Sequence, residues 1–328
     1  MAKLTVFFLF PLWSLWVGWR NRIDLLVAFG SVYAFIMSFT KWLLQKPMVT
    51  FIRGDYSFAL RMQNFPKTLL LLNKVIEYYG LLFSDKIITN NSTTRDEILK
   101  SLGKGRIPDV LVLYNNINPI NILHPEDISE TKEKYGIPEN AKVLVTAGIL
   151  TPGKNIELLI NCLPQIRIEN LYLFIVGDSP METNLHYRNS LQGLARKLGV
   201  EEKVIFTGWI EKEELWKIYL ASDLFVLPSL NEGMPNAMLE ALGSNLPCLG
   251  SNIPGMKDIL QYDELQFFPL DGKTLVDKID HFFSNIEVLD RIKKLCQERK
   301  KVFTFDWKEE VFNTIKVFAF QKLLKKGL

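Results

Sequence analysis

The chain has 328 residues, 48% of them hydrophobic and 23% charged, which is the composition of a globular protein rather than a disordered one. Its formal net charge of +3 is too small to indicate nucleic acid as the main partner. Cys162, Cys248 and Cys296 form no C-x-x-C pair, which argues against a disulfide scaffold or a zinc site and favours a reducing compartment. The length suffices for two domains of about 150 residues each.

An aromatic segment opens the chain. Residues 4–19 contain three of the seven Trp residues and no charge, and the basic residues Arg20 and Arg22 follow. The segment has about 16 residues, fewer than the ~20 that a helix needs to cross a bilayer, and Pro11 interrupts it. Three interpretations are open: a core element of the first domain, a helix on a membrane surface, and a membrane-spanning helix.

After this segment, short apolar runs alternate with stretches of helical periodicity. We expect strands over residues 23–29, 48–52, 86–89 and 110–114, and helices over 31–44, 69–83 and 93–102. Such alternation is typical of βαβ units with a parallel sheet. Residues 119–140 are polar and rich in Pro, and we interpret them as a linker.

The same alternation resumes at residue 141. We expect strands over 143–147, 171–176, 204–207, 224–227 and 247–250, and helices over 156–165, 187–198, 213–221 and 236–241. The predicted fold is therefore α/β, with two doubly wound, Rossmann-like domains over residues 1–130 and 131–302. Ligands of such sheets bind at the carboxyl ends of the strands.

The last segment, residues 303–328, forms the third predicted part of the chain. Trp307, Val311, Ile315 and Phe318 recur at three- and four-residue spacing, which predicts an amphipathic helix. We expect this helix to pack back on the first domain.

The window 224–242, with the sequence LFVLPSLNEGMPNAMLEAL, is the most informative part of the chain. A buried strand leads through a polar turn into a helix that begins near Asn236, and Pro235 suits a helix start. Backbone N–H groups from Gly233 to Asn236 are expected to point at a ligand at the end of the strand, which makes an anion site. Glu232 and Glu240 flank this helix start and suit the hydroxyl groups of a nucleotide sugar.

A second window, VLVTAGILTPGKN at residues 143–155, is again a strand followed by a glycine-containing loop and a helix. Lys154 at this point is a natural partner for a diphosphate. The loop is not a P-loop, because Asn155 stands where that motif requires Ser or Thr. Taken alone, a lysine in such a loop is more often a solvated charge.

Together these windows resemble glycosyltransferase family 4 of the GT-B fold. The motifs GILTPGK, FIVGDSP, FTGWI, SLNEGMPNAMLEAL and SNIPGMKDI follow one another in the family's order and spacing. In the first domain the resemblance is looser and rests on DLLVAFGS, VTFIRGD, SDKIITNNSTTRDEI and VLYNNIN. The first domain looks shortened, because the segment that resembles the family's fourth or so strand already starts near Ile23. A natural short form, a misassigned start codon and supply of the missing elements by another chain would each explain this.

The resemblance implies a hexosyltransferase that acts on a nucleotide-diphosphate sugar and a glycan or lipid-linked acceptor, with retention of configuration and without a metal or other cofactor. It implies that Glu232 contacts the transferred sugar, that Glu240 binds the ribose and that Lys154 neutralises the leaving phosphates. The other implied donor-binding positions are Gly148, Gly177, Ile210, Gly233, Met234, Pro235 and Asn236. The alternative is a catalytically impaired relative that binds nucleotide sugar or serves as a partner subunit.

Two single positions depart from the family pattern. Ile149 stands where the family usually has an Arg, so that one of two cations expected on the diphosphate is missing. Arg53 replaces an N-domain His, and we hypothesise that Arg53 supplies the lost charge as a catalytic residue. A surface Arg at the end of a strand would explain the same residue equally well.

The sequence also suggests where the protein acts. We expect a cytoplasmic protein, with a peripheral membrane contact through the N-terminal aromatic segment at the inner face of the membrane. No G-x-G-x-x-G follows a predicted strand, which argues against a dinucleotide-binding oxidoreductase.

Overall fold

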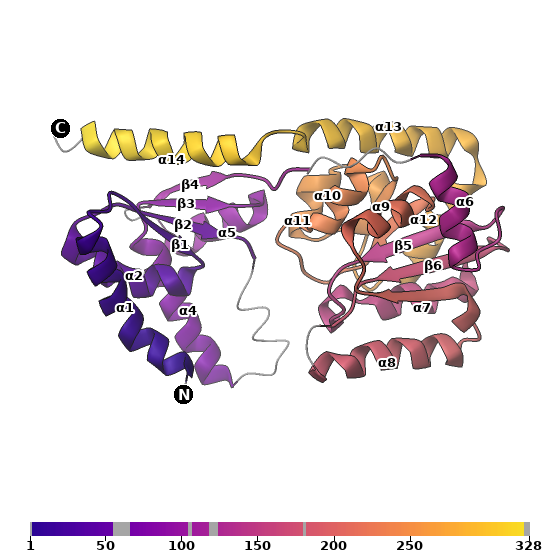
Figure 1. Ribbon diagram of the computed structural model, residues 1–328, viewed down its shortest axis with the longest axis horizontal. Helices are drawn as coiled ribbons and strands as arrows, with labels where there is room; N and C mark the ends of the chain where they lie inside the picture. Colours follow the sequence, from indigo (N-terminus) through magenta and orange to yellow (C-terminus); the bar gives the residue numbers. More distant parts are fainter. Residues whose placement is uncertain (1, 55–65, 104–106, 118–123, 180–181, 325–328) are drawn as a thin grey trace. The chain divides into compact units, whose positions relative to one another are not determined.

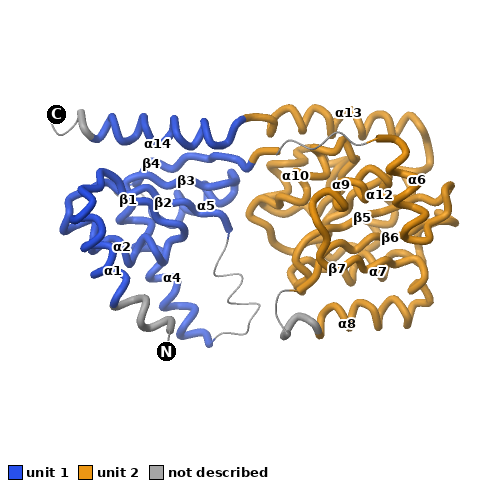
Figure 2. Tube along the Cα trace, viewed as in Figure 1, with its two compact units in different colours: residues 1–115, 306–328 blue, residues 116–305 orange. Residues whose placement is uncertain are grey.

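The computed structural model describes residues 2–54, 66–103, 107–117, 124–179 and 182–324. The chain divides into two compact units (Figure 2): unit 1 comprises residues 1–115 and 306–328, and unit 2 comprises residues 116–305. Each unit has a parallel β-sheet with helices beside it, which confirms the predicted α/β class.

Unit 1 is built on a four-stranded parallel sheet in the order β1-β2-β3-β4. The strands are β1 (Leu26–Phe29), β2 (Met48–Ile52), β3 (Lys86–Thr89) and β4 (Asp109–Val112). The helices are α1 (Ala2–Arg20), α2 (Ser31–Leu44), α4 (Lys67–Leu82), α5 (Ser92–Leu102) and α14 (Trp307–Leu324). In Figure 1, α2 and α4 lie on one side of the strands and α14 lies on the other.

The alternation of side chains along β2 and β3 builds two apolar layers in unit 1. On one face, Met48 packs with residues of β1 and α2, and Ile87 packs with residues of α4 and α5. On the other face, Val49, Phe51 and Ile88 pack against Phe318 of α14. The apolar positions of the last helix therefore bury themselves against unit 1.

A buried carboxylate ties these layers together at the start of β3. Asp85 forms ion pairs with Lys41 of α2 at 2.7 Å and with Lys322 of α14 at 3.0 Å, and it accepts a hydrogen bond from the Met48 amide at 3.0 Å. Burial alone would raise the pKa of this carboxyl, but these three partners hold the pKa below its usual range.

Unit 2 is built on a six-stranded parallel sheet in the order β10-β9-β8-β5-β6-β7. The strands are β5 (Lys142–Ala147), β6 (Leu171–Val176), β7 (Val204–Gly208), β8 (Leu224–Leu227), β9 (Cys248–Ser251) and β10 (Gln266–Phe267). The helices are α6 (Glu126–Lys134), α7 (Ile156–Cys162), α8 (Glu182–Lys197), α9 (Lys212–Leu220), α10 (Asn236–Gly243), α11 (Pro254–Leu260), α12 (Gly272–Ser284) and α13 (Ile286–Phe303). The central strands are buried on both faces, which explains why they appear in the sequence as continuous apolar runs.

The order of these strands reverses beside β5. From β5 the chain continues outward through β6 and β7, then returns to the other side of β5 with β8, β9 and β10. The loops after β5 and after β8 therefore lie on either side of a topological switch point. In open α/β sheets this is where a crevice for ligands forms.

Three expectations about the elements need correction. Residues 126–134 are not a linker but α6, whose polar sequence EDISETKEK hides its helical pattern; the linker residues 119–123 lie outside the described part of the chain. The strand expected over 23–29 begins only at Leu26. The expected C-terminal helix begins only at Trp307, as α14, because Phe303 is the last residue of the preceding helix α13; residues 325–328 are not among those described.

Candidate functional site

The loop after β5 brings a lysine to the carboxyl end of the sheet. It passes through Gly148 and a short 3₁₀ helix, Pro152–Lys154, before α7. A Cβ at Gly148 would lie 3.6 Å from Nζ of Lys154, so the lysine side chain folds back over this glycine. Tyr187 of α8 holds the start of α7, because its hydroxyl accepts a hydrogen bond from the Ile156 amide at 3.2 Å and donates one to the carboxylate of Glu157.

The loop after β8 brings a carboxylate to the same place. Oε1 of Glu232 accepts a hydrogen bond from the Ser229 hydroxyl at 2.8 Å. The backbone around Glu232 is fixed from behind by α11, where the Gly255 amide donates to the Glu232 carbonyl at 3.3 Å. A Cβ at Gly255 would lie 2.0 Å from the carbonyl oxygen of Gly233, so only glycine fits under this loop.

The two loops meet directly. Nζ of Lys154 lies 2.6 Å from Oε1 of Glu232, and both side chains are largely buried, with exposed fractions of 22% and 14%. A backbone hydrogen bond from the Leu230 amide to the Gly153 carbonyl, at 2.9 Å, holds the loops together. The structure thus joins the two residues on which the sequence argument chiefly depends, and it places them across the switch point of the sheet.

Asn236 begins α10 directly after this loop. Pro235 is the extended residue before the helix and is buried, as is Met234, while Asn236 is exposed. The helix start therefore stands four residues after Glu232 in the chain. Its first turn and the Lys154 ammonium group are both suited to an anionic ligand.

Glu240 lies on α10 and is partly buried. Burial raises the pKa of its carboxyl above the usual value, and the positive charge of Lys212 offsets this only in part. Nearby, the hydroxyl of Tyr219 is buried and has no hydrogen-bond partner among the described residues.

The strands β5, β6 and β7 all end in glycines whose φ angles are positive. These are Gly148 at 144°, Gly177 at 110° and Gly208 at 68°. The Gly177 amide donates to the Gly208 carbonyl at 3.0 Å, and a Cβ at Gly177 would lie only 2.1 Å from the Gly148 carbonyl oxygen. The three strand ends are therefore closely packed through their backbones. Ile210, two residues after Gly208, is half-buried.

The two departures from the family pattern have different surroundings. Ile149 is 47% exposed, so an apolar side chain stands at that position of the loop. Arg53 belongs to unit 1, where its guanidinium donates to Oδ1 of Asn115 at 2.6 Å and lies over the ring of Trp307 at 5.6 Å. These contacts hold the Arg53 side chain within its own unit.

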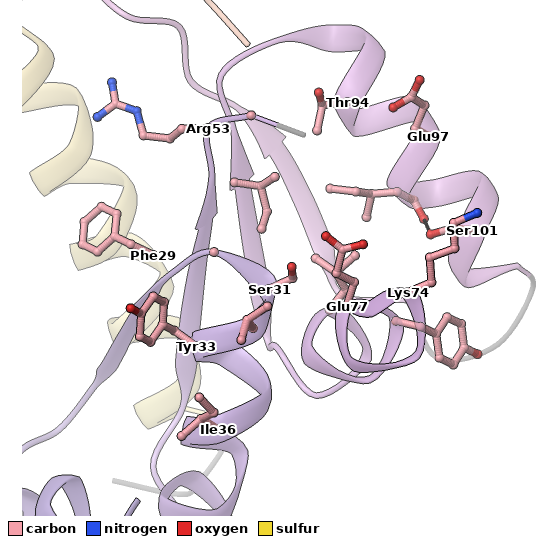
Figure 3. Close-up of a pocket in the computed structure, with 17 residues that line it drawn as sticks. Phe29, Ser31, Tyr33, Ile36, Arg53, Lys74, Glu77, Thr94, Glu97 and Ser101 are labelled. Atoms are coloured by element: carbon pink, nitrogen blue, oxygen red, sulfur yellow. Dashed lines mark hydrogen bonds between the residues drawn. The ribbon is translucent and has the colours of Figure 1, made fainter. Parts of the chain in front are cut away.

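A cavity of about 760 Å³ lies in unit 1, between the ends of β1 and β2 and the helices α2, α4 and α5. Figure 3 shows the carboxylates of Glu77 and Glu97, the hydroxyls of Ser31 and Thr94 and the aromatic ring of Tyr33 around it. An apolar cavity with a few polar groups is the usual form of a small-molecule site.

Sequence reasoning missed three supporting residues: Ser229, Gly255 and Arg188. Ser229 lies in the quoted SLNEG motif, but nothing in a motif shows which hydroxyl reaches a carboxylate. Arg188 of α8 pairs with Asp178 next to Gly208, so a cation does stand near the end of β7. Its position in α8 gave no signal that it would return to the sheet.

Comparison with known sequences decides the family. Residues 127–299 match the model of the family described as glycosyl transferases group 1. The chain belongs to this family. Several curated relatives carry the names of glycosyltransferases.

Two curated relatives illustrate the similarity. An uncharacterized glycosyltransferase of Methanocaldococcus jannaschii is 28% identical over 251 residues, which cover 74% of this chain and 62% of the relative. The UDP-Gal:α-D-GlcNAc-diphosphoundecaprenol α-1,3-galactosyltransferase of Escherichia coli is 27% identical over 244 residues, which cover 71% of this chain and 60% of the relative. The chain thus spans about three fifths of the length of these relatives.

A solved structure shares the fold. The HepE protein of Anabaena, in complex with UDP and glucose, superposes with a TM-score of 0.77 at 20% sequence identity, covering 94% of this chain and 82% of that one. This similarity shows the two-domain GT-B architecture of parallel-sheet, Rossmann-like domains.

Proposed function

We propose that this glycosyltransferase moves a hexose from a nucleoside diphosphate sugar to a glycan or lipid-linked acceptor, with retention of configuration as in family 4. The contact between Lys154 and Glu232 carries the proposal. One cation and one carboxylate, brought together from the loops on either side of the switch point, match the two halves of such a donor: an anionic diphosphate and a sugar with hydroxyl groups.

In this proposal the ion pair between Lys154 and Glu232 opens when the donor binds, and each side chain then contacts the donor. The ammonium of Lys154 neutralises the charge that grows on the diphosphate as the bond from anomeric carbon to phosphate oxygen breaks. The carboxylate of Glu232 accepts hydrogen bonds from sugar hydroxyls and so orients the anomeric carbon. The acceptor oxygen bonds to that carbon, and its proton passes to the leaving phosphate on the same face, so that neither a metal nor a covalent intermediate takes part.

We infer that Glu240 binds the ribose of the donor, and that Gly148, Gly177 and Ile210 lie against its nucleoside diphosphate. The glycine-lined strand ends allow a ligand to approach the backbone closely, and the burial of Glu240 strengthens any hydrogen bond that it accepts. A uridine nucleotide is the first donor to test, since HepE binds UDP and UDP-glucose and the E. coli relative is named for UDP-Gal.

We infer that the cavity of unit 1 receives the acceptor. Its mixed lining offers apolar contact for one part of a molecule and the carboxylates of Glu77 and Glu97 for the hydroxyls of another. A lipid-linked acceptor would place the reaction in the cytoplasm, at the inner face of a membrane, where nucleotide sugars and membrane-bound acceptors meet.

The proposal is tested by separating donor binding from turnover in three single variants. Lys154→Gln is expected to weaken binding of the nucleoside diphosphate sugar about tenfold or more, because one charge-assisted contact is lost. Glu232→Gln is expected to lower the rate of nucleoside diphosphate release about 100-fold or more, with only a small change in donor affinity. Lys273→Gln, which removes a fully solvated lysine paired with Asp277, serves as the control and should change neither quantity.

Donor affinity is measured by calorimetry with UDP-, GDP- and ADP-sugars, and turnover by release of the nucleoside diphosphate. Binding of a donor without release in the wild-type protein would contradict the proposed transfer and support the impaired relative. Equal losses of affinity and rate in Glu232→Gln would make this carboxylate a general binding or structural group.

A catalytic role for Arg53 is a separate part of the proposal. If Arg53 supplies charge to the reaction, Arg53→Ala lowers turnover while the stability of unit 1 changes little. Unchanged turnover would assign Arg53 to the contacts with Asn115 and Trp307 alone.

A further inference from the structure

Three helices of unit 1 expose large apolar side chains in addition to those that they bury against the sheet. They pack in the order α1, α2, α4, and small or hydroxyl-bearing residues lie at both crossings. The hydroxyls of Ser14 on α1 and Thr40 on α2 lie 2.6 Å apart and are buried. At the crossing of α2 and α4, a Cβ at Gly80 would lie 2.0 Å from the carbonyl oxygen of Ser31. Close approach through small residues and buried hydroxyl pairs is the way helices pack in a lipid environment.

Ile36 and Met37 of α2 and Leu81 of α4 are buried, but other large apolar side chains of these helices are exposed. Trp13, Trp16 and Trp19 on α1 are 57%, 52% and 72% exposed, and Trp42 on α2 is 74% exposed. On α4, Leu71 and Leu72 are 65% and 53% exposed. Ordinary amphipathic helices direct such residues inward, and exposed apolar surface of this kind marks an interaction site.

The chemistry of this outward face fits a bilayer of anionic lipids. Trp side chains prefer the level of the lipid headgroups, because the ring is apolar and the indole N–H is polar. Among the described side chains of these helices, Arg20, Lys67 and Lys74 are exposed basic residues, and the acidic Glu77 is half-buried. Basic residues beside inserted aromatic rings add attraction to negatively charged headgroups.

None of the helices in the described part of the chain combines the length and apolar composition needed to cross a bilayer. We therefore propose that α1, α2 and α4 together form a surface that docks unit 1 on an anionic membrane, with the outward Trp and Leu side chains inserted at the headgroup level. We name this surface, defined by Trp13, Trp16, Trp19, Trp42, Leu71 and Leu72, the docking face. It extends the expected contact of the N-terminal segment to two further helices, and it does not depend on the proposed sugar transfer.

The test is flotation of the full chain with vesicles of phosphatidylcholine alone or with 30% phosphatidylglycerol. The wild type should float with the anionic vesicles, less with neutral ones, and less again at about 0.5 M salt. Replacing Trp13, Trp16 and Trp42 together by Gln should lower partitioning about 1000-fold, since each buried ring contributes about tenfold. The matched control replaces Phe312 and Phe320 of α14, which are equally exposed at 62% each in the same unit, by Gln and should bind like the wild type.

Far-UV circular dichroism and the urea midpoint establish that both variants are folded, which is expected because the substituted side chains are exposed. Failure of the wild type to float with any vesicle would overturn the proposal, as would equal losses in the docking-face and α14 variants. A wild-type protein that ignores vesicles but forms dimers, which the triple Trp variant loses, would assign the face to a second copy of the chain. Donor binding, measured in the same variants without lipid, should be unchanged and keeps this test separate from that of the sugar transfer.

Discussion

The crossing of Gly148 and Gly177 offers the sharpest test of how unit 2 builds its candidate site. In Gly177→Ala the new Cβ would lie 2.1 Å from the Gly148 carbonyl oxygen, whereas carbon and oxygen normally approach to about 3.3 Å. One strand end must therefore move by about an ångström. The φ angle of 110° adds backbone strain of about 1–3 kcal/mol for a residue with a side chain. With an overpacking cost of about 1–3 kcal/mol, we expect a loss of about 2–6 kcal/mol in the free energy of unfolding.

Gly193→Ala is the matched control for this substitution. Gly193 lies inside α8, and no atom stands within 4 Å of where its Cβ would be. The same chemical change should therefore stabilise the protein by about 0.5–1 kcal/mol through helix propensity. Hydrogen exchange of β5 and β6 peptides at increasing urea measures both changes in unit 2 alone. A loss below about 1 kcal/mol in Gly177→Ala, or the same sign in both variants, would refute the reasoning.

Further predictions concern single charged groups and the metal requirement. Asp85→Asn is expected to cost about 2–3 kcal/mol of stability at pH 7, because Lys41 and Lys322 lose a buried partner. Since the folded pKa of Asp85 is lowered, the wild-type advantage should persist down to the usual carboxyl range and disappear as the pH falls below it; an advantage that is constant with pH would contradict the ion pairs. For Glu240 the sign is opposite: its raised pKa means that stability falls as the pH rises above about 4.5, so Glu240→Gln should melt higher than the wild type at pH 7 yet bind nucleotide more weakly. If Glu240→Gln both melted at a lower temperature than the wild type and bound nucleotide more weakly, Glu240 would be a structural residue. Sugar transfer is expected to survive EDTA, and loss of activity that Mg²⁺ or Mn²⁺ restores would show that a metal takes part.

The sequence predicted most of unit 2 because its strands are buried on both faces. Continuous apolar runs such as residues 224–227, bounded by turn residues, have few other interpretations. The helix α6 was not predicted because its sequence is polar and shows no apolar periodicity. It is held by ion pairs of Asp127 with Lys217 and of Lys134 with Glu214, and such contacts with a distant helix leave no periodicity in the local sequence.

The candidate site was predictable in its residues but not in its contacts. Spacing placed Lys154 and Glu232 on loops at the carboxyl ends of two strands, yet nothing local showed that β8 returns beside β5 and brings the two side chains to 2.6 Å. Likewise, the aromatic segment left three interpretations open. The choice between them depends on which side of α1 faces α2, and this is a tertiary property: Ser14 faces inward and Trp13 outward.

The positive φ angles of unit 2 occur in two kinds of place, the ends of helices and the ends of strands. At Gly136, Gly199 and Asn245 they follow α6, α8 and α10, where a left-handed residue ends a helix in the ordinary way. At Gly148 and Gly177 they follow adjacent strands, where no helix needs ending, and at Gly177 a single methyl group would collide with the backbone of Gly148. A residue in the extended conformation after each strand would avoid the strain of a positive φ angle. The close approach of the two backbones at Gly177, next to the Lys154 side chain that lies over Gly148, is what the proposed nucleoside diphosphate would need in order to lie against these strand ends.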